Sequence, residues 1–246
     1  LYSVEAMPTT FILDRDGNVR YLHKGFKPGY EKKYEKEVKK PFYQLVADSI
    51  AEVGKLDKNI ADLQVKNSVF RINRDIRFSK DKTPYNLHVS AALSPTGRKN
   101  MEYPGMYIHL NIDTCNFGGG CYMPSKENLE NIRRFIVSNP KEVETALADK
   151  AFVDTFGELE PGEKNKILPK EFKEFGEQYP LLFNKQFYYM ANYAGEETIL
   201  RTDLLPFIVN HFRAATAFND VLKKAMKLLK NITGIDWEHS IQFCKN

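Results

Sequence analysis

The sequence predicts an α+β protein in which an antiparallel sheet packs against long amphipathic helices, preceded by an N-terminal β-hairpin plus helix. Two observations indicate this class. Short runs of alternating apolar and polar residues follow one another in the middle of the chain, and the flanking stretches carry apolar residues at helical spacing. A hydrophobic content of 42% over 246 residues is ample for a packed core, which excludes a disordered chain.

The hairpin is expected over residues 9–23, where two β-prone runs flank an Asp-Gly turn. From Tyr30 onward the chain is rich in helix formers, and its apolar residues keep helical spacing up to an expected stop at Gly54. Pro41 is expected to kink or divide this helix, because proline lacks the amide donor and clashes with the preceding turn.

The middle of the chain is expected to form an antiparallel meander. Alternation and turn residues predict strands at residues 69–78, 87–93, 106–112 and 117–122, and a further strand at 186–193. The triplet from Gly118 to Gly120 matches neither the dinucleotide-binding nor the P-loop pattern, so it is interpreted as a glycine bulge in a strand.

Helices and one long loop are expected to make up most of the remainder. Residues 157–180 are rich in Gly, Pro and charge and are expected to be mostly loop. The predicted helices run from Lys126 to about Val137 behind a Ser125 cap, from Asn139-Pro140 to about Ala148, and over seven turns from Thr202 or Asp203 to Leu229.

Two expectations concern the side chains of that last helix. His211 borders its apolar stripe and is expected to be a satisfied residue at the edge of the core rather than a ligand. Lysines on the wet side of an amphipathic helix usually do no more than solvate it, and this is expected for Lys223, Lys224, Lys227 and Lys230.

Charge and cysteine content exclude several classes of protein. The formal charge of +4 is spread along the chain, which falls short of the basic face of a dedicated nucleic-acid binder. Cys115, Cys121 and Cys244 show neither a C-x-x-C motif nor a zinc spacing, so buried free thiols are expected, although Cys115 and Cys121 could pair if they lie on neighbouring strands. No apolar run is long enough to span a membrane, and a cytoplasmic location without a cofactor is expected.

The basic stretch from Arg71 to Asn86 is the first candidate for a binding site. In a strand Phe70, Ile72, Ile76 and Phe78 would face the core, whereas Arg71, Asn73, Asp75 and Arg77 would face the other way, and Arg74 would need a partner on the apolar side. The polar row is consistent with an ordinary solvated face. The following loop favours an anion site instead, because Lys80, Lys82 and Thr83 add ammonium and hydroxyl donors beside Arg77.

The next two predicted strands add two histidines. Alternation places His88 and Ser90 on one face of residues 87–93, and Tyr107, His109 and Asn111 on one face of residues 106–112. If these strands are antiparallel neighbours, His88, His109, Tyr107, Arg71 and Arg77 converge on one polar sheet face that can bind an anion and move a proton. No metal is expected, because Asp75 is the only carboxylate near the two histidines.

Two family resemblances run along the chain. The segment SVEAMPTTFILDRDGNVRYLHKGFKPGYEKKYEKEV resembles the C-terminal part of a thioredoxin-like domain of the thiol-reductant type, without the strand and helix that carry C-x-x-C. From about Tyr34 to Leu229 the chain resembles the uncharacterised DUF2461 family, most specifically at FRINRDIRFSKDKTPYN, PGMYIHL and FGGGCYMPSKENLENIR. The resemblances imply a thioredoxin-like fragment over residues 1–38, a DUF2461-like domain over 39–231 and a C-terminal tail over 232–246. They imply no established activity.

Three functional hypotheses follow. The first is a pocket for a small phosphate- or carboxylate-containing ligand, built from Arg71, Arg77, Lys80, Lys82, Thr83 and Tyr107, with His88 and His109 available for proton transfer without a cofactor. The second is a module that binds nucleic acid or an acidic protein through the same basic residues. The third is a remnant of a thioredoxin-like redox protein that lacks an active dithiol. The sequence does not indicate an oligomeric state.

Overall fold

The computed structural model describes residues 9–13, 19–24, 31–72, 77, 86, 88–99 and 101–227, and within these ranges it describes side chains from Lys40 to Met226. Several residues named above lie outside the described residues: Asn73, Arg74, Asp75, Ile76, Phe78, Lys80, Lys82, Thr83, Lys230 and Cys244. The side chain of Lys227 also lies outside the described part.

A four-stranded antiparallel sheet forms the centre of the fold. Its strands lie in chain order and are β3 (His88–Leu93), β4 (Gly105–Asn111), β5 (Thr114–Cys121) and β6 (Phe187–Ala194). A separate two-stranded sheet pairs β1 (Thr9–Leu13) with β2 (Val19–Lys24), as the Asp-Gly turn predicts. The α+β class is therefore confirmed.

Helices account for most of the remaining described chain. The longer ones are α1 (Glu31–Leu56), α3 (Lys126–Ser138), α4 (Pro140–Leu147), α7 (Leu204–Ala214) and α8 (Thr216–Lys227). The shorter ones are α2 (Val65–Ser68), α5 (Lys150–Phe156), α6 (Gly195–Ile199) and the 3₁₀ helices η1 (Gly97–Lys99), η2 (Lys170–Phe175) and η3 (Pro180–Phe183). The Ser125 hydroxyl accepts a hydrogen bond from the Asn128 amide, which confirms the expected cap of α3.

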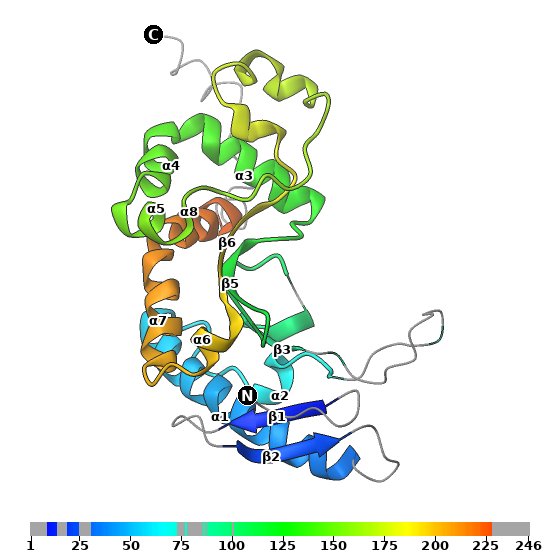
Figure 1. The fold of residues 1–246 in the computed structure, drawn as a ribbon. Helices are drawn as coiled ribbons and strands as arrows, with labels where there is room; N and C mark the ends of the chain where they lie inside the picture. Colours follow the sequence, from blue (N-terminus) through cyan, green and yellow to red (C-terminus); the bar gives the residue numbers. More distant parts are fainter. Residues whose placement is uncertain are drawn as a thin grey trace.

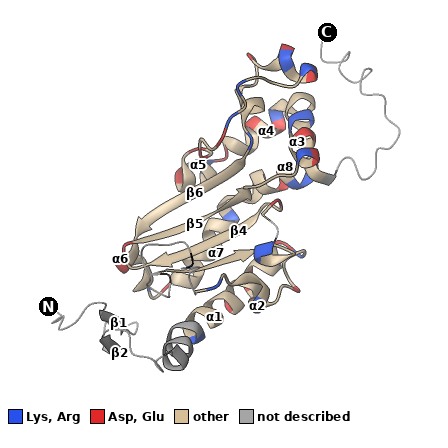
Figure 2. Ribbon diagram, turned by 90° about the vertical axis from the view of Figure 1, so that its right-hand side faces the viewer, with Lys and Arg blue, Asp and Glu red and all other residues tan. Residues whose placement is uncertain are grey.

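The helices α1 and α7 cover one face of the sheet, as Figure 1 shows with the strands seen nearly edge-on. One core cluster joins Val46 and Val53 of α1 to Ile108 and Phe117 of the sheet. A second cluster lies at the other end of the strands, where α3, α4, α5 and α8 enclose residues such as Phe187. In the view of Figure 2 the strands lie in front and α7 lies behind them. The helices therefore leave the opposite face of the sheet as the place to look for a site.

Pro41 does not divide the first long helix. Pro41 lies inside α1, which continues past Gly54 to Leu56. The side chains of Phe42, Val46, Ile50 and Val53 are all buried, and this packing outweighs the single hydrogen bond that Pro41 removes. Gly54 instead allows close packing, since an added Cβ would lie 2.9 Å from the Cα of Ala61.

The expected seven-turn helix at the end of the chain is two helices. It breaks at Ala215, whose amide bonds back to the carbonyl of Phe212 at 3.2 Å. The Thr216 hydroxyl donates to the same carbonyl at 3.2 Å. A hydroxyl that bonds back into the preceding turn competes with the amide ladder and bends a helix, which accounts for the boundary between α7 and α8.

The expected strand at 69–78 is also wrong in its described part. Only Val69 forms a bridge, with Ala91 of β3, and residues 70–72 follow β3 without a regular ladder. The amide of Phe70 donates to the carbonyl of Ser90 at 2.9 Å, and the amide of Asn86 donates to that of Ile72 at 2.7 Å. These bonds cover part of the outer edge of β3.

The glycine triplet of β5 does not form a bulge. Gly118, Gly119 and Gly120 pair with β4 on one side and with β6 on the other without a register shift. Glycine is required at Gly120, where φ is +92° and an added Cβ would lie 2.3 Å from the carbonyl oxygen of Phe187. The outer edge of β6 receives the amide of Glu160, which donates to the carbonyl of Tyr188 at 2.9 Å.

A buried ion pair joins the end of α1 to α8. Lys223 Nζ lies 2.8 Å from Asp57 Oδ2, and the two side chains are only 13% and 3% exposed. The hydroxyl of Tyr103 donates to the same oxygen at 3.0 Å, and Asn59 donates to the other through its amide and side chain. Burial alone would raise the pKa of Asp57, but the bonds from Lys223 and Asn59 outweigh it and hold the pKa below its usual value. Lys223 therefore does more than solvate α8.

His211 and the described cysteines are parts of the core. His211 is buried, with Nδ1 2.7 Å from the carbonyl oxygen of Phe207 and Nε2 2.7 Å from the Tyr193 hydroxyl, so the expectation of a satisfied histidine is confirmed. Cys115 and Cys121 are free and buried. They lie on the same strand, about 20 Å apart at the usual rise per residue, so they cannot pair. Within the described part of the chain, no helix has the length and apolar character to cross a membrane.

Candidate functional site

The face of the sheet opposite α1 and α7 carries most of the polar side chains of the strands. The register places Ser90, His109, Asn116 and Asn192 directly opposite one another across all four strands. The apolar residues of β3 and β4 point to the helical side, as the alternation predicts: Val89, Ala91 and Leu93 in β3, and Met106, Ile108 and Leu110 in β4. Sequence alternation thus identified the polar face correctly.

None of the four strands contains Asp, Glu, Lys or Arg, as the tan ribbons of the sheet in Figure 2 show. Charged groups near the polar face therefore come from the segments beside the sheet. Arg71 lies next to β3, and Arg98 belongs to η1.

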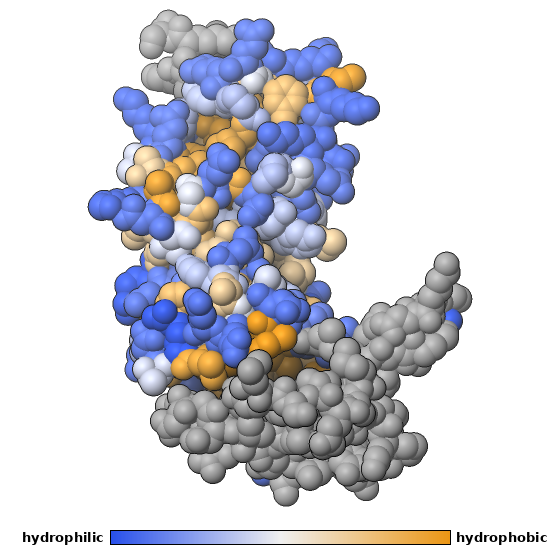
Figure 3. Space-filling view, viewed as in Figure 1, coloured by the Kyte–Doolittle hydropathy of each residue, from blue (hydrophilic) through white to orange (hydrophobic). Residues whose placement is uncertain are grey.

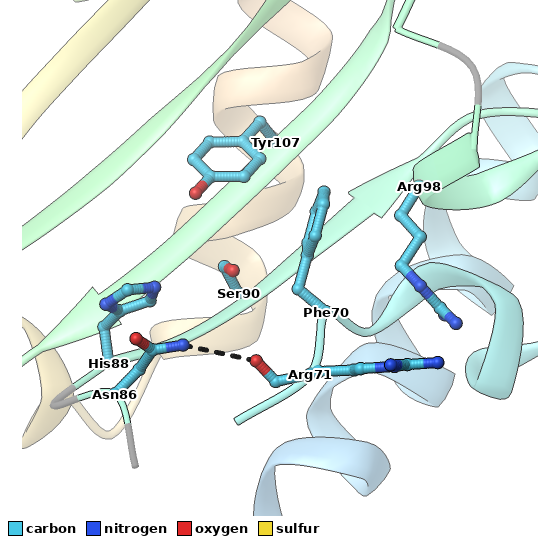
Figure 4. Close-up of a pocket in the computed structure, with 7 residues that line it drawn as sticks. All are labelled: Phe70, Arg71, Asn86, His88, Ser90, Arg98 and Tyr107. Carbon is cyan, nitrogen blue, oxygen red and sulfur yellow. Dashed lines mark hydrogen bonds between the residues drawn. The ribbon is translucent and has the colours of Figure 1, made fainter. Parts of the chain in front are cut away.

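A pocket of about 560 Å³ opens at the β3 side of this face. Its described lining comes from the 70–72 segment, from Asn86, from β3, from β4 and from η1, and includes Phe70, Arg71, Asn86, His88, Ser90, Arg98 and Tyr107 (Figure 4). In Figure 4 the guanidinium groups of Arg71 and Arg98 lie at one end, His88 and Asn86 lie at the other, and the ring of Phe70 stands between. The volume lies in the range of small-molecule sites.

Backbone and side-chain bonds hold the guanidinium end in place. Arg98 Nη1 donates to the carbonyls of Lys66 at 2.6 Å and Val69 at 2.8 Å, which fixes η1 against α2 and the start of the 70–72 segment. Nε and Nη2 of Arg98 carry three further N–H groups. The Asn86 side-chain amide donates to the carbonyl of Arg71 at 3.3 Å and holds the backbone of that residue (Figure 4).

The guanidinium of Arg71 is exposed at the pocket. The ion pairs among the described residues use other lysines and arginines, so no described carboxylate neutralises Arg71 or Arg98. Two guanidinium groups at one end of a pocket repel each other unless an anion lies near both.

The histidine end contains a stack of two rings. The centroids of His88 and His109 are 4.4 Å apart and the ring planes differ by 26°. The hydroxyl of Tyr107 lies 3.3 Å from His109 Nδ1. Burial lowers the pKa of His88, and burial together with the neighbouring His88 lowers the pKa of His109. Both rings are therefore neutral near pH 7 and can accept a proton.

The hydroxyl groups of Tyr107 and Ser90 complete this end of the pocket. Ser90 is buried, and burial raises the pKa of the Tyr107 phenol above its usual value, although the neighbouring Ser90 side chain acts in the opposite direction. Tyr107 is therefore a neutral donor at physiological pH.

The structure brings together part of the set that the sequence predicts. Arg71, His88 and Tyr107 line the pocket, and His109 lies behind His88 without lining it. Arg77 is exposed and is not part of the lining. Lys80, Lys82 and Thr83 lie outside the described residues, so their membership stays a prediction.

Sequence reasoning missed four of the lining residues. The alternation predicts Phe70 on the core side of a strand, and it gives no ligand-binding role to Asn86 or Arg98. Ser90 was placed on the polar face without a role. The only local signal for Arg98 is its position in a Gly-Arg-Lys turn, which does not reveal what the arginine contacts.

The described residues provide no other obvious reaction centre. They contain no group of three His, Cys, Asp or Glu side chains that could hold a metal ion. Burial raises the pKa of Cys115, and burial together with Glu102 raises that of Cys121 to about 12. Both thiols are therefore protonated and shielded, which does not favour redox chemistry at β5.

Comparisons with known proteins identify relatives at the level of sequence. No curated protein and no solved structure shows significant similarity to this chain. The model of a family described as "Conserved hypothetical protein (DUF2461)" matches residues 24–220, which include all four strands of the sheet and the pocket. The chain therefore belongs to the DUF2461 family.

Proposed function

We propose that this protein binds a small phosphate- or carboxylate-containing anion in the pocket between β3, β4 and η1. The observation that carries the proposal is the pair of guanidinium groups, Arg71 and Arg98, at one end of a pocket of about 560 Å³ without a described carboxylate beside them. Guanidinium groups bind phosphate and carboxylate through paired N–H donors, and an anion between the two would relieve their repulsion.

The other end of the pocket supplies groups for proton transfer. His88 lines the pocket as a neutral imidazole, so it can accept a proton from a bound ligand or from a water molecule that attacks the ligand. His109 packs against His88 and is held in turn by the Tyr107 hydroxyl. In the catalytic version of the proposal, His88 is the proton acceptor and His109 positions it.

One feature supports a small ligand over a nucleic-acid backbone, and a second supports it over a protein partner. The four strands contain no Lys or Arg, whereas a nucleic-acid platform needs cations spread along the strand that it binds. The visible face in Figure 3 mixes hydrophilic side chains with separate groups of hydrophobic ones, so it offers no broad apolar surface for a protein partner.

A thermal-shift screen of inorganic phosphate, phosphate esters and small carboxylates tests the proposal. A ligand at 100 times its Kd stabilises the folded state by about 2.7 kcal/mol, which raises the Tm of a domain of this size by roughly 5–11 °C. Arg71→Gln is expected to abolish most of this shift in Tm, because it removes one of the two guanidinium groups of the proposed site. The Arg71 side chain is exposed, so its removal should not disturb packing.

The matched control is Arg213→Gln. Arg213 is also exposed, and it lies on α7 behind the sheet, so the variant removes the same charge without touching the pocket. The proposal fails if no small anion raises the Tm of the unaltered protein, or if the two variants respond equally. A response that collapses with salt and requires polyanions would indicate the nucleic-acid or acidic-protein alternative.

A further inference from the structure

The pocket has two chemically different ends. The guanidinium groups of Arg71 and Arg98 mark one end, and ring side chains dominate the rest of the described lining. A bare phosphate held by the two arginines would leave the ring-lined part of a 560 Å³ pocket unused. The lining therefore suits a ligand that carries a second part.

Three ring side chains from three separate segments meet at the pocket. Phe70 precedes β3, His88 begins β3, and Tyr107 lies in β4. The rings of Phe70 and Tyr107 meet edge to face, with centroids 6.1 Å apart and planes at 75°. Phe70 is only partly buried and stands in Figure 4 between the guanidinium end and the histidine end. Such a ring in the middle of a binding pocket offers a surface for stacking.

Among the described residues, His109 stacks on one face of His88 only. His109 does not line the pocket, whereas His88 does, so we place the ligand against the other face of His88. A planar ring placed there would continue the stack. Beside it, the side-chain oxygen of Asn86 can accept a hydrogen bond from a ring N–H, because the amide nitrogen of that side chain is the atom bonded to Arg71.

We infer that the ligand is a phosphomonoester that carries a heteroaromatic ring, in the chemical class of the nucleoside monophosphates. This inference rests on the proposed anion site. The phosphate lies at Arg71 and Arg98, the ring lies against Phe70 and His88, and Asn86 contacts the edge of the ring. Stacking on aromatic and histidine rings, with an amide at the base edge, is how proteins bind unpaired bases.

The arrangement favours one base over a strand of bases. On the polar face, β5 contributes Asn116, Gly118 and Gly120, so the rings of β3 and β4 do not continue across the sheet. The guanidinium groups also lie together at one end of the pocket rather than along the face (Figure 4). A single phosphate joined to a single ring matches this distribution.

Isothermal titration calorimetry of the unaltered protein with four ligands is the first test. Adenosine and uridine monophosphate carry the ring, ribose 5-phosphate lacks it, and inorganic phosphate lacks the sugar as well. Base stacking on a side chain is worth about 1–3 kcal/mol, so at least one nucleotide is expected to bind roughly 5- to 150-fold more tightly than ribose 5-phosphate.

Variants locate the ring. Phe70→Leu keeps an apolar side chain without the aromatic face, and His88→Gln keeps a polar one without the ring. Each is expected to lower the preference for the nucleotide over ribose 5-phosphate by at least about fivefold relative to the unaltered protein. Tyr122→Leu is the matched control, because Tyr122 is exposed and packs on Tyr188 away from the pocket.

The outcomes separate this inference from the proposed function. Equal affinity for nucleotides and ribose 5-phosphate overturns the inference and leaves the anion site standing. An unchanged nucleotide preference in both ring variants also overturns it. If none of the four ligands binds, the proposed function fails with it. Much tighter, strongly salt-dependent binding of a single-stranded oligonucleotide overturns the assignment to a mononucleotide.

Discussion

Replacing Lys223 by methionine should destabilise the protein by about 2–3 kcal/mol at neutral pH. Removing one partner of a buried ion pair costs about 3–5 kcal/mol, because the other charge stays buried without compensation. Asp57 is 3% exposed, so that cost applies here. The hydrogen bonds that Tyr103 and Asn59 donate to Asp57 remain in the variant, so the expected destabilisation is about 2–3 kcal/mol rather than the full cost. For a domain of this size the Tm should fall by about 4–12 °C.

Lys224→Met is the control for this experiment. Lys224 is the next residue on α8 and pairs with Glu142, but its side chain is 61% exposed, so its loss should leave the Tm nearly unchanged. Calorimetric or circular-dichroism melts of the two variants give the comparison. Equal Tm values for both variants, or a Lys223→Met protein as stable as the unaltered chain, would refute the reasoning that burial makes this pair important.

Three further predictions concern other parts of the fold. Gly97→Ala should lower the free energy of unfolding in urea by more than about 2 kcal/mol, because φ is +62° and the new Cβ would lie 2.2 Å from the carbonyl oxygen of Asn67. Gly157→Ala, at φ +73° in open space, should lower it by only about 1–2 kcal/mol, and equal losses would contradict this account. In a Cys244→Ser background the two thiols of β5 should resist Ellman's reagent until urea unfolds the chain, because both are buried and burial raises their pKa. Rapid reaction of the folded protein would show that these thiols are accessible. Burial lowers the pKa of His88 below its ordinary value of 6.5, so the folded state binds fewer protons than the unfolded state and the Tm should fall as the pH drops below about 6.5. His88→Gln should lessen that fall in Tm. An identical pH profile of Tm for both proteins would exclude His88 as a contributor.

The strands of the meander could be predicted because their residues alternate cleanly. In 106–112 each apolar residue is followed by a polar one, and β4 forms within one residue of the predicted bounds with the predicted faces. The stretch at 69–78 alternates just as well in its first half, but among its described residues only Val69 pairs with β3. Alternation identifies residues that suit a strand, whereas a ladder also requires a neighbouring edge that continues beside it.

The division of the last helix could not be predicted from apolar spacing. Ile208, Phe212, Ala215 and Leu222 are all buried, as a continuous helix would require. The break depends on the Thr216 hydroxyl and on packing that differs on its two sides, since α7 covers one core cluster and α8 the other. A periodic stripe reports that residues are buried and does not report that they enter different cores.

The candidate site was predictable where it depends on strand alternation. His88 and Tyr107 were found because period-two patterns fix which face a side chain occupies. Arg98 and Asn86 were missed because their positions depend on contacts between distant segments, through the carbonyls of Lys66 and Arg71. The expected boundary between residues 38 and 39 stays a prediction, and α1 runs through it without a break.

The order of the strands has a consequence for synthesis on the ribosome. The meander from β3 to β5 is complete once Cys121 has been made, but β6 follows only after about 65 further residues. At a translation rate of about 5–20 residues per second, the edge of β5 that pairs with β6 stays unpaired for roughly 3–13 s. That edge belongs to a strand rich in glycine and apolar residues, which is a surface that chaperones bind and that promotes aggregation. The nascent chain should therefore depend most on chaperone protection while residues 122–186 are being translated.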